Sequence, residues 1–180
     1  MSGTVVKAML FGKLPAHGDF VCRGLDAAER EQWDAFLTAS LEAARERMGD
    51  AFEQHYDAAP PYRFFQHASA LAGSVAPSVD AAGRRFPLMV AVCGLSPGQA
   101  EAGSAAMEGL IYAALAECWA ADRLHLEAGK ETGVPEREAA AIPCDRWWVD
   151  DTVASGFPRF LEAFPMDLMT AMAGPAEIAW

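Results

Sequence analysis

Short apolar runs bounded by glycine and proline predict most of the strands of this chain. The first run covers residues 4–11 and stops at Gly12. Residues 62–66 are aromatic and strand-like, and residues 74–80 form a weaker extended segment with a proline inside it. Residues 85–93 are apolar on both faces, which is typical of a central strand. Because short turns separate the last three runs, we expect an antiparallel meander.

Apolar residues at helical spacing predict two long helices. The first covers residues 27–48 and begins with a capping box formed by Asp26 and Glu29. The second is predicted to begin with Ser96 as its cap and to continue to about Glu127. Its predicted buried stripe consists of Met107, Leu110, Ile111, Ala114, Leu115 and Cys118.

The last third of the chain contains weaker signals. Residues 128–143 are rich in glycine, proline and glutamate and predict a mobile surface connection. Residues 146–149 predict a last strand, and residues 157–172 predict two short helices separated by Pro165. We therefore expect a single α/β (α+β) domain over residues 1–180, with a mainly antiparallel central sheet flanked by two long helices. This order of elements is similar to profilin-like or longin-like modules.

Composition and charge narrow the classes of function. The 180 residues are 52% hydrophobic, enough for one buried core. The net charge of −11 repels phosphate backbones and anionic bilayers, so we expect neither nucleic acid binding nor membrane insertion. The apolar stretch at residues 86–95 is too short to span a bilayer, and residues 1–7 lack the features of a signal peptide. These features predict a cytoplasmic protein.

Cysteines and histidines show no spacing typical of a metal site or a disulfide framework. We therefore expect no metal, no cofactor and reduced thiols, most of them in the core. The residues concerned are Cys22, Cys93, Cys118, Cys144, His17, His55, His67 and His125.

The dipeptide Gly12-Lys13 invites comparison with a phosphate-binding loop. That motif requires a glycine five positions before Gly12 and a serine or threonine after the lysine. Lys7 and Leu14 occupy these positions, so a nucleotide site is not expected.

Two small sets of residues suggest a hydrolase as an alternative. Residues 94–98 form a G-x-S-x-G set between a predicted strand and a predicted helix, which is the context of a nucleophile elbow around Ser96. However, Pro97 has no N–H to contribute to an oxyanion hole, and His125 is predicted at the far end of the same helix. His17 and Asp19 are a second candidate pair, but they lack the further partners that a metal or catalytic site requires.

Basic residues flank two predicted loops. Lys13 and Arg23 flank the loop after the first strand, and Arg84 and Arg85 precede the central strand. One hypothesis is a charge-assisted network that staples the two loops together. The other is a surface that a partner protein recognises. The residues proposed for the network are Lys13, Asp19, Asp80 and Arg84.

Five segments of the chain carry a resemblance to a known family. They are FGKLPAHGDFVCR at residues 11–23, WDAFL at 33–37, APPYRF at 59–64, PSVDAAGRRFPL at 77–88, and the pair Trp147-Trp148. Together they resemble the ordered motifs of the type VI secretion-associated TagF family, also called ImpM. Ala81, Ala82 and Arg85 depart from the family pattern, which leaves the finer surface chemistry open.

The resemblance implies a non-enzymatic, post-translational regulator of type VI secretion assembly, usually a repressor. The implied partner is the cytoplasmic forkhead-associated scaffold protein, whose activation is linked to a threonine kinase and an opposing phosphatase. A small hydrolase and a structural subunit of the secretion apparatus remain alternatives. The family-motif residues, which are the candidates for partner binding, are Gly12, Lys13, Pro15, His17, Gly18, Asp19, Phe20, Arg23, Pro77, Ser78, Asp80, Gly83, Arg84, Arg85 and Pro87.

Overall fold

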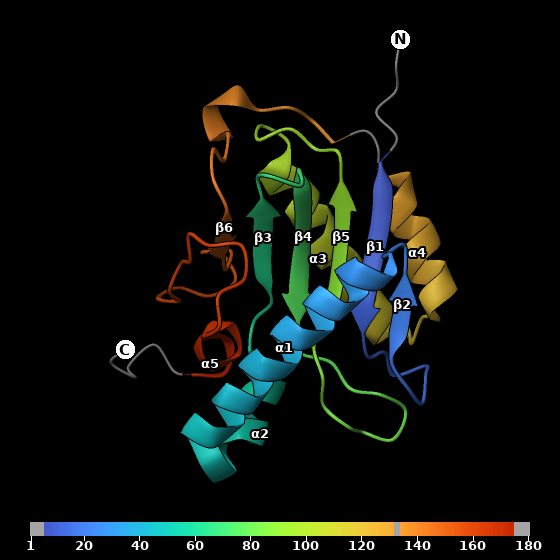
Figure 1. The fold of residues 1–180 in the computed structure, drawn as a ribbon, viewed down its shortest axis with the longest axis vertical. Coiled ribbons are helices and arrows are strands. Elements are labelled where there is room, and N and C mark those ends of the chain that lie inside the picture. Colours follow the sequence, from blue (N-terminus) through green and yellow to red (C-terminus); the bar gives the residue numbers. More distant parts are fainter. Residues whose placement is uncertain (1–5, 132–133, 175–180) are drawn as a thin grey trace.

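Six strands form one antiparallel sheet in the order β2-β1-β5-β4-β3-β6 (Figure 1). The computed structural model describes residues 6–131 and 134–174. The strands are β1 (Lys7–Gly12), β2 (Val21–Arg23), β3 (Tyr62–Gln66), β4 (Leu71–Ala76), β5 (Leu88–Cys93) and β6 (Arg146–Trp148). The α-helices are α1 (Ala27–Met48), α2 (Phe52–Asp57), α3 (Ala100–Ala116), α4 (Ala121–Lys130) and α5 (Leu168–Ala173). Short 3-10 turns occur at Gly49–Ala51 and Glu138–Ala140.

The predicted antiparallel meander is confirmed, because β3, β4 and β5 are consecutive neighbours in the sheet. The bounds of two strands were wrong: the weak segment at 74–80 is the end of β4 and a loop, and β5 begins at Leu88. Pro77 and Pro87 lack the N–H that a strand pairing uses, which accounts for both limits. Residues 4 and 5 of the first predicted strand lie outside the described residues.

Alternate residues of the strands face two cores, one on each side of the sheet. Phe11 of β1 and Met89 of β5 pack beneath α1 and α5. Their neighbours Leu10 and Val90 face α3 and α4 on the other side. Figure 1 shows α1 crossing the front of the sheet while α3 and α4 lie behind it. The two-sided burial of β5 explains why its sequence is apolar throughout.

Helix α1 agrees with its prediction at both ends. The Asp26 carboxylate accepts a hydrogen bond from the Glu29 N–H (2.8 Å), and the Glu29 carboxylate accepts one from the Asp26 N–H (2.8 Å). Trp33 of this helix packs against Phe64 of β3, with ring centroids 5.3 Å apart. Phe64 in turn stacks on Trp147 at 4.5 Å. Trp33 and Trp147, which belong to family motifs outside the two loops, therefore pack in the core.

The single long helix predicted from Ser96 to Glu127 was wrong, because the chain forms α3 and α4 instead. The N-cap of α3 is Gln99, and Ser96 precedes the helix. At the other end Cys118 has a φ of 52°, and the Trp119 N–H bonds to the Ala114 carbonyl oxygen (2.9 Å). This six-to-one bond closes a Schellman stop, in which glycine is the usual residue at the left-handed position.

The cysteines are free thiols, but the prediction that most lie in the core was wrong. Cys22 and Cys93 are half-buried, whereas Cys118 and Cys144 are exposed. Cys118 leaves the predicted buried stripe because α3 has already ended at Ala116.

The C-terminal segment, as far as the structure describes it to residue 174, has one helix, α5, where two were predicted. Phe160 forms an antiparallel bridge with Trp147, with N–O distances of 2.9 and 3.1 Å. That bridge extends the sheet edge and prevents a helix around residue 160. The region predicted as a surface connection begins later than expected, since α4 continues to Lys130. Among the described helices, none combines the length and the apolar character needed to cross a bilayer.

Replacing Cys118 with glycine is expected to stabilise the protein. A left-handed conformation costs a non-glycine residue roughly 1–2 kcal/mol, and glycine removes this cost. Part of the gain is offset because glycine also increases the conformational entropy of the unfolded chain. We expect C118G to raise the free energy of unfolding by about 0.5–1 kcal/mol in urea denaturation. Ala35→Gly, at an exposed position in the middle of α1, should instead lower it by about 1 kcal/mol. Equal losses in both variants would contradict the Schellman interpretation.

Candidate functional site

The family motif forms two loops at one end of the sheet, residues 13–20 and residues 77–87. The first loop connects β1 to β2, and the second connects β4 to β5. In the antiparallel register Gly12, the last residue of β1, pairs with Leu88, the first residue of β5. The same edge therefore receives both loops, although 65 residues separate Lys13 from Ser78 in the chain.

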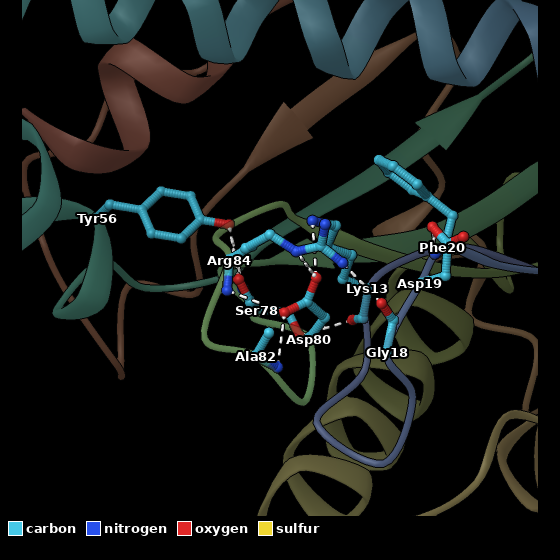
Figure 2. Close-up of polar contacts among 9 residues, drawn as sticks. All are labelled: Lys13, Gly18, Asp19, Phe20, Tyr56, Ser78, Asp80, Ala82 and Arg84. Atoms are coloured by element: carbon cyan, nitrogen blue, oxygen red, sulfur yellow. Dashed lines mark hydrogen bonds and ion pairs between the residues drawn. The ribbon is translucent and has the colours of Figure 1, made fainter.

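Asp80 holds the two loops together (Figure 2). Its side chain is fully buried, and its Oδ2 atom lies 3.0 Å from Lys13 Nζ and 2.8 Å from Arg84 Nε. Its Oδ1 atom accepts hydrogen bonds from the N–H groups of Ala82 (3.0 Å) and Arg84 (2.9 Å). The Arg84 guanidinium also donates from Nη2 to the carbonyl oxygen of Gly18 (2.7 Å). The predicted staple of Lys13, Asp80 and Arg84 is confirmed.

The same contacts control the charge of Asp80. Burial alone would raise the pKa of its carboxyl group. The hydrogen bonds from the backbone of Arg84, from Lys13, from the Arg84 side chain and from the backbone of Ala82 outweigh burial and hold the pKa well below its usual range. Asp80 is therefore an ionised anchor throughout the neutral range, with cations on two sides.

Ser78 adds a second, uncharged link. Its hydroxyl donates to the carbonyl oxygen of Lys13 (2.7 Å), and its N–H donates to the Tyr56 hydroxyl oxygen (3.1 Å). Burial raises the pKa of the Tyr56 hydroxyl, which keeps it protonated and able to donate weakly to the Ser78 carbonyl oxygen (3.4 Å). Tyr56 belongs to α2, an element that the sequence analysis missed. The four-residue spacing of Phe52 and Tyr56, both buried, was the available signal.

Arg85 also bonds to α2 and not to the first loop. Its guanidinium forms a two-point contact with the Asp57 carboxylate, at 2.8 and 2.7 Å, and lies 3.1 Å from Glu53. The hydrogen bond with Arg85 holds the pKa of Asp57 below its usual range. Helix α2 thus fixes the second loop through Ser78 and Arg85.

Two further motif residues, His17 of the first loop and Arg23 of β2, bond to α4. The His17 ring nitrogen Nε2 accepts the N–H of Ala121 (3.0 Å), the first residue of the helix. Arg23 bonds to Asp122 (2.7 Å). Asp19 does not join the Asp80 staple as predicted: it is exposed, and its carboxylate accepts the N–H of Phe20 (2.8 Å). Figure 2 shows the Asp19 side chain beside Phe20, apart from the Asp80 carboxylate.

Glycine and proline shape the frame of the motif. Gly12 has a φ of 134°, and a Cβ atom there would collide with the carbonyl oxygen of Pro87. Gly83 allows the tight turn in which its N–H bonds to the Asp80 carbonyl oxygen (2.9 Å). Pro15 and Pro77 both line a hollow of about 450 Å³ between the loops and α2.

Phe20 is the exposed aromatic residue of the motif, with 47% of its surface accessible. Its ring is nevertheless held in place, 4.8 Å from Phe86 and 5.9 Å from Phe11 between centroids. The Lys13 ammonium lies 5.1 Å from the centre of the same ring. Phe20 is therefore a fixed apolar surface directly above the Lys13 and Asp80 pair.

The hydrolase candidates do not form a catalytic arrangement in the described residues. The Ser96 hydroxyl donates to Glu136 (3.0 Å), and His125 bonds through Nε2 to the carbonyl oxygen of Ala8 (3.1 Å). His17 is bonded to the start of α4 and not to Asp19. The described residues also contain no group of three or more His, Cys, Asp or Glu side chains that could hold a metal ion.

The fold and the two locked loops define a mixed α/β domain that presents a motif surface on a rigid frame. The chain belongs to the family described as "TagF N-terminal domain, Type VI secretion system-associated", whose model matches residues 9–129. This range includes both loops and α1.

A solved structure supports the fold independently. The chain is similar to the crystal structure of PA0076 from Pseudomonas aeruginosa PAO1, with a TM-score of 0.71, 24% identity and 96% of each chain covered. Comparison with curated proteins gives no match. At this identity the likeness concerns the fold alone.

Gly12→Ala is expected to destabilise the protein strongly. The left-handed φ and the collision with Pro87 should together cost about 3 kcal/mol or more of unfolding free energy, measured by urea denaturation. Gly18→Ala is the matched control in the same loop, because nothing lies within 4 Å of a Cβ placed there. That variant should stay within about 0.5 kcal/mol of the wild type. A G12A protein of unchanged stability would contradict the close approach of β1 and Pro87.

Stability should depend on pH through Asp80. Because its folded pKa is lowered, the ionised group contributes stability above the unfolded pKa of about 3.9. This contribution is lost as the pH falls from about 5 toward the folded pKa. The urea midpoint of the wild type should therefore exceed that of Asp80→Asn at pH 7, and the gap should narrow below about pH 4.

Asp122→Asn is the control for this titration. The contact with Arg23 also lowers the pKa of Asp122, but its side chain is 84% exposed, so solvent screens the pair. We expect a much smaller difference from the wild type at each pH. A D80N gap that stays constant from pH 7 to pH 3 would contradict the charged role of Asp80.

Proposed function

We propose that this protein is a non-enzymatic regulator of type VI secretion, a repressor of assembly that acts by binding the forkhead-associated scaffold protein in the cytoplasm. The observation that carries the proposal is the family match over residues 9–129, which spans every motif of the two loops. The regulation is post-translational, since it operates by contact between finished proteins. It acts alongside the threonine kinase and phosphatase that control the scaffold.

The geometry of the loops supports a binding role. Arg84 keeps 62% of its side chain exposed although it bonds to Asp80 and Gly18, and Phe20 is exposed beside it. Arginine and aromatic residues are enriched where protein interfaces derive most of their affinity. Because Asp80 and Gly18 hold Arg84, and Phe86 and Phe11 hold Phe20, little conformational entropy is lost when a partner binds.

The bonding of the candidate nucleophiles is consistent with this proposal. Ser96 and His125 each have a bond to a different neighbour, Glu136 and the Ala8 carbonyl oxygen. Pro97, directly after Ser96, supplies no N–H for an oxyanion. A binding role uses the exposed loop residues, whereas hydrolysis would require these side chains to rearrange.

Affinity capture tests the proposal. The tagged protein, expressed at its native level in cells with an assembled apparatus, should retain the forkhead-associated scaffold. Overproduction should reduce secretion of an apparatus substrate, because bound scaffold is withdrawn from assembly. Arg159→Gln, which changes an exposed side chain outside the two loops, should behave like the wild type in both measurements.

Two outcomes would contradict the proposal. One is the absence of the scaffold from the captured material together with normal secretion on overproduction. The other is stable, stoichiometric incorporation of the protein into the purified apparatus, which would identify a structural subunit instead.

A further inference from the structure

A hollow of about 520 Å³ lies between α1 and the two loops. We name it the α1 hollow. One wall is the exposed side of α1, and the other is the turn at the end of the second loop. Its lining consists of Lys13, Phe20, Thr38, Leu41, Glu42, Arg45, Glu53 and residues 83–86.

Lys13 contributes a buried cation to this hollow. Its side chain is only 9% exposed, and its ammonium makes one ion pair, with Asp80 at 3.0 Å. A lysine ammonium has three N–H donors, and among the described residues no second acceptor bonds to this one. The Phe20 ring, 5.1 Å away, offers only its face. A buried ammonium with unused donors favours an anionic acceptor from outside the molecule.

The charges around Lys13 limit the charge of the anion that can bind there. Lys13 and Arg84 share the single carboxylate of Asp80, which leaves one positive charge in excess. Arg85 bonds to Asp57 and lies 3.1 Å from Glu53, so these three groups carry one negative charge in excess. Glu42 and Arg45 of α1 also line the hollow. The excess positive charge at Lys13 and Arg84 matches a single carboxylate, whereas a phosphate dianion would be repelled by Glu42 and Glu53, which line the same hollow.

The walls of the hollow add an apolar requirement. Phe20 presents an accessible ring at the rim, fixed by Phe86 and Phe11. Leu41 of α1 lines the opposite side. A carboxylate that reaches Lys13 must therefore pass an apolar surface, on which a neighbouring aliphatic side chain would pack.

We propose that the α1 hollow binds a segment of a partner protein in which a glutamate or aspartate stands next to a large aliphatic residue. The carboxylate bonds to Lys13 and Arg84, and the aliphatic side chain packs on Phe20. The identity of the partner as the forkhead-associated scaffold rests on the proposed function. The chemistry of the site rests on the geometry alone.

A peptide titration tests the site without the scaffold. The probes are acetyl-Leu-Glu-Leu-amide, the same peptide with glutamine, and the same peptide with phosphothreonine, added to isotope-labelled protein and followed by NMR. The glutamate peptide should shift the backbone signals of Phe20, Thr38 and Arg84 in a saturable way. The glutamine peptide should bind about tenfold more weakly, since it carries no charge.

Variants locate the binding more closely. Arg84→Gln and Phe20→Ala should each weaken the glutamate peptide about tenfold. Arg159→Gln and Leu161→Ala are the matched controls, because these side chains are also exposed but lie in the C-terminal segment. Thr38→Tyr fills the hollow from α1 without altering the Asp80 staple and should also abolish binding. This variant keeps the test decisive if the loop variants prove unstable.

Three results would overturn the proposal. They are equal binding of the glutamate and glutamine peptides, tighter binding of the phosphothreonine peptide, and shifts that are absent or lie away from the hollow. Capture of the scaffold by the same variants then separates the two proposals. Wild type that fails to bind the scaffold refutes the proposed function, whereas undiminished capture by T38Y and F20A refutes the use of the α1 hollow by the scaffold.

Discussion

The buried carboxylate of Asp80 is the interaction on which the loop end of the molecule depends. It accepts bonds from both loops at once, so the end of β1 and the start of β5 are fixed by side chains as well as by strand pairing. Buried ion pairs contribute little net stability, but removal of one partner leaves an uncompensated charge. The staple therefore specifies one arrangement of the loops. This arrangement determines where Phe20, Arg84 and the α1 hollow lie.

Local signals in the sequence predicted the elements that local chemistry determines. The bounds of α1 follow from the Asp26 and Glu29 capping box, and the central place of β5 follows from its two-sided apolar pattern. The break between α3 and α4 was not predictable in this way, because Cys118 adopts the left-handed conformation that normally requires glycine. The bridge of Phe160 to Trp147 depends on tertiary pairing, which no local pattern of the tail indicates.

The candidate site shows the same division. Opposite charges in two motifs were sufficient to predict that Lys13, Asp80 and Arg84 meet, since a charge in an apolar surrounding needs a partner. The depth of Lys13 could not be predicted, because the Phe20 ring and the second loop bury it together. Likewise Arg85, adjacent to Arg84, turns to Asp57 of α2. Arg84 and Arg85 are adjacent in sequence but bond to different partners, and the position of α2 determines which partner Arg85 reaches.

The bond between His125 and the Ala8 carbonyl oxygen has a consequence for the rim of the sheet. Strand β2 pairs only with Leu10–Gly12, so the first half of β1 would otherwise offer unpaired backbone groups to any extended chain nearby. A histidine from α4 occupies the acceptor at Ala8 (3.1 Å). Blocked edges of this kind protect proteins from unwanted strand addition. Helix α4, which covers one of the two cores, thus also blocks strand addition at the first half of β1.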